Sequence, residues 1–225
     1  MPSQPSRSRR APKRPKLDLS PKVTPAQSRA TETYEHLLTV TAQVLAEVGF
    51  ELLTTNLVCE RAKLSPPALY RYFPNKYALL HELGLRLMQK QNALIPLWLT
   101  PAAFGSAKKL EDAIAGLLLE TYKVTRNTTG GIWIMRALRA MPMLQDVRLD
   151  SAKAVAVEAS ARLSKAFPDI ARKDLELISR VADSMAYAAL EMLFDDPSLD
   201  APSVTRLVAA SLASHVTRLR GKARA

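Results

Sequence analysis

Apolar residues recur at steps of three and four along most of this chain, which is the spacing of one face of an α-helix. The first such run extends from Tyr34 to Val48, and Gly49 is expected to end its helix. Further helices are expected at about 76–94, 110–125, 130–140, 146–167, 172–194 and 202–220. Because few segments alternate with a period of two, the pattern predicts an all-α protein.

Two short apolar segments, Asn56–Ala62 and Pro66–Phe73, are separated only by the turn Lys63–Ser65. So short a turn predicts a helix-turn-helix, in which the second helix is presented to a major groove of DNA. The apolar residues of these two segments can pack them on the helix that ends at Gly49.

The turn between the two short helices has residue types that suit the start of a helix. Ser65 fits an N-cap, and Pro66 fits the first helical position, where a missing N–H costs nothing. Because Pro67 also lacks an N–H, the N–H of Ala68 is the expected donor to the Ser65 hydroxyl.

The apolar pattern of the two short helices separates an expected core from an expected surface. The core set is Leu57, Val58, Ala62, Leu64, Leu69 and Phe73. The outward-facing set is Pro66, Ala68, Arg71 and Tyr72, with Tyr70 at the edge. Pro66, Pro67 and Ala68 suit thymine methyl groups, whereas Arg71 suits bidentate binding to guanine or contact with a phosphate. Tyr72 could reach DNA or only pack.

The stretch SPPALYRYFPNKYALL, residues 65–80, resembles the TetR family of transcriptional repressors. The resemblance covers about Ser28–Leu80 and includes Thr54-Thr55, Val58, Ala62, Leu64-Ser65, Ala68-Leu69-Tyr70, Phe73 and Lys76–Leu80. It implies a three-helix DNA-binding domain followed by a larger helical domain that binds a ligand and dimerises. The expected division is a basic arm at 1–24, the DNA-binding domain at 25–75 and the effector-binding and dimerisation domain at 76–225.

The resemblance also implies roles for single residues. Tyr70 is expected to contact a DNA phosphate, and Lys76 is expected to hold another at the start of the next helix. Thr54 or Thr55 is expected to meet the DNA backbone, although either could serve only as a helix cap. The family usually has glycine where this chain has Lys63, and a left-handed lysine costs roughly 1 kcal/mol.

The net charge of +11 is spread unevenly along the chain. Residues 1–24 hold seven Lys or Arg against one acid, Asp18, and are rich in proline and serine. This arm is expected to be disordered, and it either contacts DNA or is only a solvated tail. No apolar run of the kind found in signal peptides follows its basic residues.

The larger helical part has no motif of comparable strength, but its methionine and aromatic side chains suit a small apolar or amphipathic effector. Ordinary core packing is the alternative for each of them. The candidate pocket residues are Met88, Trp98, Tyr122, Trp133, Met135 and Arg136. Arg136 could recognise an acidic ligand or belong to a solvated face.

Two helices near the C-terminus combine apolar and small side chains and are expected to form a four-helix interface in a homodimer. The candidate interface residues are Ala182, Met185, Ala186, Ala189, Leu193, Leu207, Val208, Ser211, Leu212 and His215. Burial within one subunit is the alternative for some of them. A homodimer would present two recognition helices to a roughly palindromic operator in double-stranded DNA.

Motifs for catalysis and for cofactor binding are missing from the sequence, so an enzyme is not expected. His36, His81 and His215 lie far apart, and neither a metal nor a cofactor is predicted. The single cysteine, Cys59, is expected in the core and fits a reducing cytoplasm, and no membrane span is expected. The sequence thus predicts a dimeric repressor released by an effector. The alternatives are a nonspecific nucleic-acid-binding protein and a ligand-independent regulator or activator.

Overall fold

The computed structural model describes residues 17–22 and 28–223, with side chains through residue 219. Within these ranges the chain forms helices joined by short turns, and it forms no strand. The helices are α1 (Ser28–Leu52), α2 (Thr55–Ala62), α3 (Pro66–Tyr70), α4 (Lys76–Asn92), α5 (Ile95–Trp98), η1 (Pro101–Gly105), α6 (Ala107–Asn127), α7 (Gly131–Ala140), η2 (Pro142–Leu144), α8 (Gln145–Ala166), α9 (Arg172–Asp195) and α10 (Ala201–Ala223).

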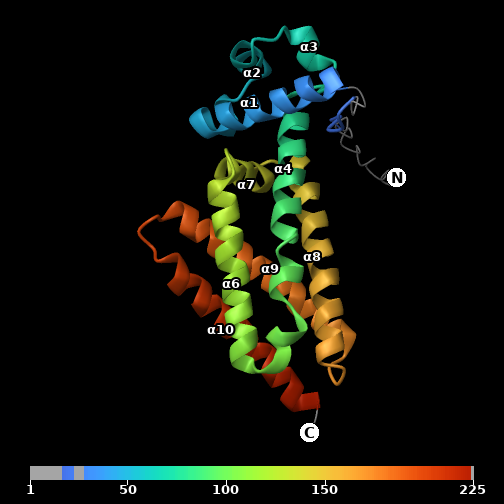
Figure 1. Ribbon diagram of the computed structural model, residues 1–225, viewed down its shortest axis with the longest axis vertical. Coiled ribbons are helices and arrows are strands. Elements are labelled where there is room, and N and C mark those ends of the chain that lie inside the picture. Colours follow the sequence, from blue (N-terminus) through green and yellow to red (C-terminus); the bar gives the residue numbers. More distant parts are fainter. Residues whose placement is uncertain (1–16, 23–27, 224–225) are drawn as a thin grey trace, which may run out of the picture.

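The helices are arranged in two parts along the long axis of the molecule (Figure 1). We call α1, α2 and α3 the N-terminal layer. From this layer α4 runs into a helical body that also contains α6, α8, α9 and α10. At the junction, α7 packs against both α1 and α4. α4 therefore belongs to both parts and connects them.

The predicted all-α fold is confirmed, and α6 to α10 begin and end within three residues of the predicted bounds. α3 is shorter than predicted, because regular helix ends at Tyr70 and the chain continues as a turn in which the Phe73 N–H donates to the Leu69 carbonyl at 2.9 Å. The short helices α5, η1 and η2 were not predicted, since a few residues cannot show a helical period.

The prediction of a disordered arm through residue 24 is wrong for Leu17–Lys22. The Lys22 N–H donates to the Tyr72 carbonyl at 2.8 Å, and the Asn75 amide donates to the Asp18 carbonyl at 2.9 Å. These bonds hold the segment beside the loop that joins α3 to α4. Residues 1–16, 23 and 24 lie outside the described residues.

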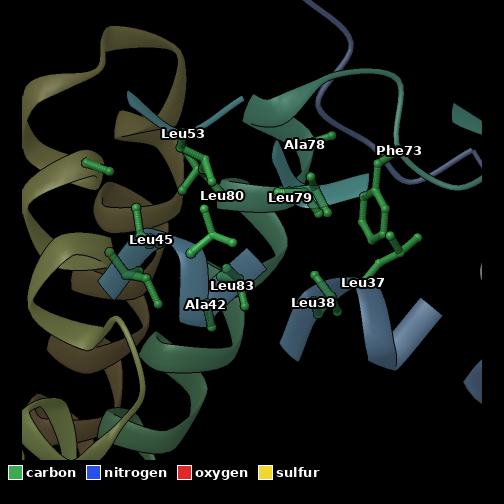
Figure 2. Packing of buried hydrophobic residues seen from close by; sticks show 14 of the residues in the cluster. Leu37, Leu38, Ala42, Leu45, Leu53, Phe73, Ala78, Leu79, Leu80 and Leu83 are labelled. Carbon is green, nitrogen blue, oxygen red and sulfur yellow. The ribbon is translucent and has the colours of Figure 1, made fainter. Parts of the chain in front are cut away.

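One apolar core joins the N-terminal layer to the upper end of the body. Leu38 and Leu45 of α1 pack with Leu79 and Leu80 of α4, as Figure 2 shows. The same core contains Leu138 of α7, and all five side chains are almost fully buried. Burial of each leucine stabilises the fold by about 1.5–3 kcal/mol. The layer is therefore fixed to the body by packing as well as by chain connectivity.

Helix α1 has a kink at Gly49, where the sequence predicted its end. Gly49 has φ 73° and ψ 176°, and one further turn follows to Leu52. A Cβ atom at this position would lie 3.2 Å from two ring carbons of Trp133 on α7. Glycine is therefore required twice, once by the backbone conformation and once by the close approach of the indole ring.

Charged groups of α4 and α1 make a second link between the two parts. Arg86 forms a bidentate pair with Glu35 of α1, at 2.6 and 2.7 Å, and also bonds to Glu82 at 2.9 Å. Bidentate arginine–carboxylate pairs fix orientation better than a single contact does. The pair also lowers the pKa of Glu35 through its hydrogen bonds to Arg86.

We predict that Gly49→Ala destabilises the protein by about 1–3 kcal/mol, because alanine is strained at positive φ and its methyl group would displace Trp133. Chemical unfolding measures the free energy change. Gly105→Ala is the matched control, since a Cβ atom there meets nothing closer than 3.7 Å. Equal stability of the two variants would contradict the proposed constraint at Gly49.

Candidate nucleic-acid interface and interior cavity

Helices α2 and α3 form the predicted helix-turn-helix. Thr54 caps α2, because its hydroxyl accepts the Leu57 N–H at 3.1 Å. After α2, Lys63 takes the left-handed conformation, with φ 54° and ψ 39°. The Leu64 N–H then donates to the Cys59 carbonyl at 3.0 Å, which closes the helix end. Lys63 therefore has the left-handed backbone conformation that was expected to cost free energy in a residue other than glycine.

The predicted side-chain cap at Ser65 is wrong. Ser65 takes the extended conformation of an N-cap, but its hydroxyl accepts no bond from α3. The Ala68 N–H donates at 2.9 Å to the backbone carbonyl of Ser65 instead. The exposed hydroxyl is therefore left for another partner.

The surface of α3 is mostly as predicted, with one correction. Pro66, Pro67 and Arg71 are exposed, and Ala68 is half-buried. Tyr72 does not face outward: it is 4% exposed and packs edge to face on Tyr34 of α1, with ring centroids 6.1 Å apart. Its placement on the DNA-binding surface is therefore wrong, because its ring completes the core beneath α3.

Thr55 and Tyr70, two predicted phosphate contacts from different helices, lie together in the structure. The Thr55 hydroxyl and the Tyr70 hydroxyl are 2.9 Å apart and share a hydrogen bond. Tyr70 is 40% exposed, so its hydroxyl is accessible at the edge of α3. The first turn of α2 and the end of α3 thus present two hydroxyl groups at one place.

Lys76 occupies the predicted position at the start of α4, but its ammonium group points at α1. It donates to the carbonyls of Leu53 at 2.9 Å and Phe50 at 3.3 Å. A cation next to the free carbonyls of a helix C-terminus is stabilising. Asn75 caps α4 by accepting the N–H groups of Tyr77 and Ala78, both at 3.0 Å.

A cavity of about 140 Å³ lies inside the body, among α4, α6, α8, α9 and α10. Most of its lining is apolar and comes from leucine, isoleucine, valine and alanine side chains. Polar groups from Gln91, Asn92, Asp183 and Tyr187 also line it. Largely apolar pockets with a few polar groups are typical of small-ligand sites.

The predicted effector-pocket residues do not line this cavity. Met88 and Met135 belong to the core above it. Their sulfur atoms accept hydrogen bonds from two lining residues, Tyr187 at 2.8 Å and Gln91 at 3.7 Å. Both methionines thus contact the lining without forming it, and a helical pattern does not distinguish a cavity wall from the core beside it.

The other four predicted pocket residues pack elsewhere. Trp98 lies against Gly116 of α6, where a Cβ atom would come within 2.0 Å of its ring. Tyr122 stacks on Phe194 of α9, with ring centroids 5.2 Å apart. The remaining two belong to the junction.

At that junction, Trp133 contacts Phe50 edge to face. Arg136 pairs with Asp195 at 2.8 Å and lies over the Trp133 ring. Neither residue therefore reaches the cavity, and the basic group expected for an acidic ligand is already paired.

Asp183 is a half-buried carboxylate that faces the cavity. Burial raises the pKa of Asp183 to about 6, although the nearby Arg148 acts in the opposite direction. Among the described residues, no donor makes a hydrogen bond to this carboxylate. Sequence reasoning missed Asp183, since a lone acid within a helix gives no signal.

The predicted dimer residues differ in how exposed they are. Met185, Leu207, Val208, Ser211 and His215 are exposed or half-buried. A groove of about 420 Å³ between α9 and α10 is lined by four of the predicted dimer residues, Met185, Ser211, Leu212 and His215.

The other five predicted dimer residues are buried or line the interior cavity, and their place in a dimer stays a prediction. Ala189, Leu193 and Leu212 are buried within the subunit. Ala182 and Ala186 line the interior cavity, as does Leu212. The apolar stripe of α9 thus faces its own subunit more than the sequence suggested.

Three further features of the described residues concern Cys59, metal sites and membrane helices. Cys59 is a buried free cysteine, as predicted, and burial raises the pKa of its thiol. No cluster of His, Cys, Asp and Glu among the described residues could hold a metal ion. Within the same residues, no helix has the length and apolar character needed to cross a membrane.

This geometry defines a helix-turn-helix domain on a larger all-α body. Residues 37–83 match the family model of bacterial regulatory proteins, tetR family. Over 50 residues the chain is 42% identical to the tetracycline repressor protein class G of Vibrio anguillarum, a match that covers 22% of this chain and 24% of that repressor. Residues 37–83 are therefore similar to the DNA-binding domain of the TetR family, and the chain spans about a quarter of the length of the curated relative that it matches.

Solved structures extend the likeness to the body. A tetR-family transcriptional regulator from Streptomyces coelicolor is 14% identical, with a TM-score of 0.62 over 86% of this chain and 88% of that one. Salmonella enterica GusR is 22% identical, with a TM-score of 0.59 over 86% of this chain and 98% of that one. The chain thus has the all-α fold of TetR-family regulators along most of its length.

We predict that Asp183→Asn stabilises the protein at neutral pH by about 1–2 kcal/mol, after allowance for screening of this half-buried group by solvent. The folded pKa of about 6 lies above the ordinary value of 3.8, so the folded protein binds this proton more tightly than the unfolded chain. The stability of the native protein should therefore fall, relative to the variant, as pH rises from about 4 to about 6.

Unfolding by urea at several pH values measures this difference. The control is Asp150→Asn, which removes an exposed carboxylate paired with Lys153 at 2.8 Å and should give a small change. A gain for Asp183→Asn that is equally large at pH 4 and at neutral pH would show that titration of Asp183 is not its cause.

Proposed function

We propose that the protein is a sequence-specific DNA-binding transcriptional repressor, which acts as a homodimer and leaves its operator when a small effector binds. The observation that carries this proposal is the exposed face of α3. It presents Pro66, Pro67 and Arg71, and the paired hydroxyls of Thr55 and Tyr70 lie beside it. Small side chains for base contact and hydroxyls for phosphate contact are thus combined on one surface.

The chemistry of this surface suggests how a sequence would be distinguished. Arg71, which directly follows α3, is the long hydrogen-bond donor of this surface, and it suits the O6 and N7 atoms of guanine. Pro66, Pro67 and Ala68 suit thymine methyl groups. With so few polar groups, we infer that DNA shape and the spacing of two half-sites contribute much of the specificity.

The groove between α9 and α10 supports the proposed homodimer. Its exposed apolar residues include Leu177 at 63% and Val181 at 47%, which is unusual for side chains of this size. Leu207 on α10 is 72% exposed. A twofold axis at this face would bring two pairs of helices together and would relate two recognition helices to a palindromic operator.

The path from effector to DNA is proposed to run through α4. Its C-terminal part lines the cavity through Gln91 and Asn92, and its first residue, Lys76, holds the end of α1. An effector must bind the DNA-free state more tightly by about 1–3 kcal/mol to release the operator. A role in the cytoplasm, where DNA is located, follows from this proposal.

A nonspecific nucleic-acid-binding protein is the second candidate, and the basic arm favours it. The described segment Leu17–Lys22 lies beside the loop after α3, and six basic residues precede it in the sequence. Arm contacts with phosphates would add affinity for every sequence.

We predict that Tyr70→Phe weakens binding to all sequences by about threefold to tenfold, because it removes one phosphate-contacting hydroxyl. Arg71→Ala should weaken binding and also remove the preference at one base position. Selection of bound fragments from random DNA, followed by fluorescence anisotropy, measures both effects.

The control for these variants is Lys153→Ala, which removes a cation from the helical body and should leave DNA binding unchanged. Equal affinity of the native protein for a selected palindrome and its scrambled version would refute the repressor. If Arg71→Ala has the same base preferences as the native protein, Arg71 does not contact a base.

We predict that deletion of residues 1–16 makes DNA binding less dependent on salt, because each lost phosphate contact lowers the slope of log K against log salt by about one. The deletion retains Leu17–Lys22, so the contacts to Tyr72 and Asn75 stay in place. An unchanged slope would mean that the arm does not touch DNA.

A further inference from the structure

Asp183 is the only charged residue among the described residues that line the interior cavity. The walls around it include Ile95, Leu118 and Leu163, which offer no polar group. A carboxylate in such surroundings loses hydration that nothing replaces, and this is costly unless the charge is paired. A ligand of this cavity would therefore be stabilised by a group that pairs with the Asp183 carboxylate.

Two other polar side chains that line the cavity, Gln91 and Tyr187, already have partners. The Gln91 amide donates to the Thr125 hydroxyl at 2.7 Å. The Tyr187 hydroxyl donates to the Met88 sulfur at 2.8 Å. Asp183 accepts no hydrogen bond from any described residue, so its carboxylate is the acceptor left for a ligand.

Arg148 of α8 is the cation that acts on Asp183 from within the subunit. Its charge favours the carboxylate, but the two side chains form no ion pair in the described structure. The Nε atom of Arg148 is itself buried without a partner. The guanidinium therefore reduces the cost of the buried carboxylate without satisfying its hydrogen bonds.

The size of the cavity limits the apolar part of the ligand. Its volume of about 140 Å³ is close to that of an engineered cavity of about 150 Å³ that binds benzene. We propose that the cavity binds a small cationic amphiphile, namely one ring or a short aliphatic group with a protonated amine that pairs with Asp183. This inference rests on the proposed function, for which it names the class of effector.

Calorimetric titration of the full chain with three matched compounds tests this proposal near neutral pH. The compounds are 2-phenylethylamine, 2-phenylethanol and phenylacetate, which share a ring and differ in charge. We expect the amine to bind about tenfold or more tightly than the alcohol, because the charged hydrogen bond adds to the same apolar contact. Stronger or equal binding of the alcohol or phenylacetate, or no binding of any compound, would overturn the proposal.

Two variants locate the binding site. Asp183→Asn should remove the preference for the amine while it retains binding of the alcohol. Ala186→Val places two more methyl groups at the cavity wall and should weaken the binding of both the amine and the alcohol. The exposed control Asp150→Asn should bind like the native protein. A preference for the amine that survives in Asp183→Asn would refute the ion pair.

Operator binding is measured separately, so the two proposals can fail independently. Fluorescence anisotropy of the selected operator, with and without 2-phenylethylamine, reports whether ligand and DNA are coupled. Amine binding without any change in operator affinity supports the cationic site and refutes its role as the effector site. Loss of sequence preference in the ligand-free protein refutes the repressor and leaves the calorimetric result as it stands.

Discussion

The C-terminal end of α1 is held by side chains from two other helices, and the orientation of the N-terminal layer depends on this hold. Lys76 of α4 donates to the carbonyls of Phe50 and Leu53, while Trp133 of α7 packs against Gly49. α2 follows this end after a short turn. We therefore expect a movement of α4 or α7 to act on the end of α1, which lies only two residues before α2.

The interior cavity reaches α4 directly and contacts α7 only through Gln91. Gln91 of α4 lines it and donates both to Thr125 of α6 and to the Met135 sulfur of α7. A ligand that pushes on Gln91 would thus act on α4 and α7 together. Packed cores respond to such a push by moving between alternative arrangements, since they are close-packed and not softly deformable. The proposed release from DNA needs only a small shift at this point.

Local rules predicted most helix ends, because a cap involves residues only two or three positions apart, as at Thr54 and Asn75. Local rules could not predict contacts between residues that are far apart in the sequence. Tyr72 is buried because α1 supplies Tyr34, 38 positions away along the chain. Periodicity also marked α9 as apolar, yet the same stripe can face a core, a cavity or a second subunit. Asp183 could not be recognised until the fold placed apolar walls around it.

α9 contributes to both the cavity and the exposed groove. Ala182 and Ala186 line the cavity, whereas Val181 and Met185 lie in the groove with α10. Adjacent residues of a helix differ in direction by about 100°, so these two faces adjoin along the same turns. A ligand that displaces α9 at Asp183 would therefore change the proposed dimer face in the same movement. In a twofold dimer that change is applied to both subunits, and the spacing of the two α3 helices must match DNA half-sites about 34–36 Å apart.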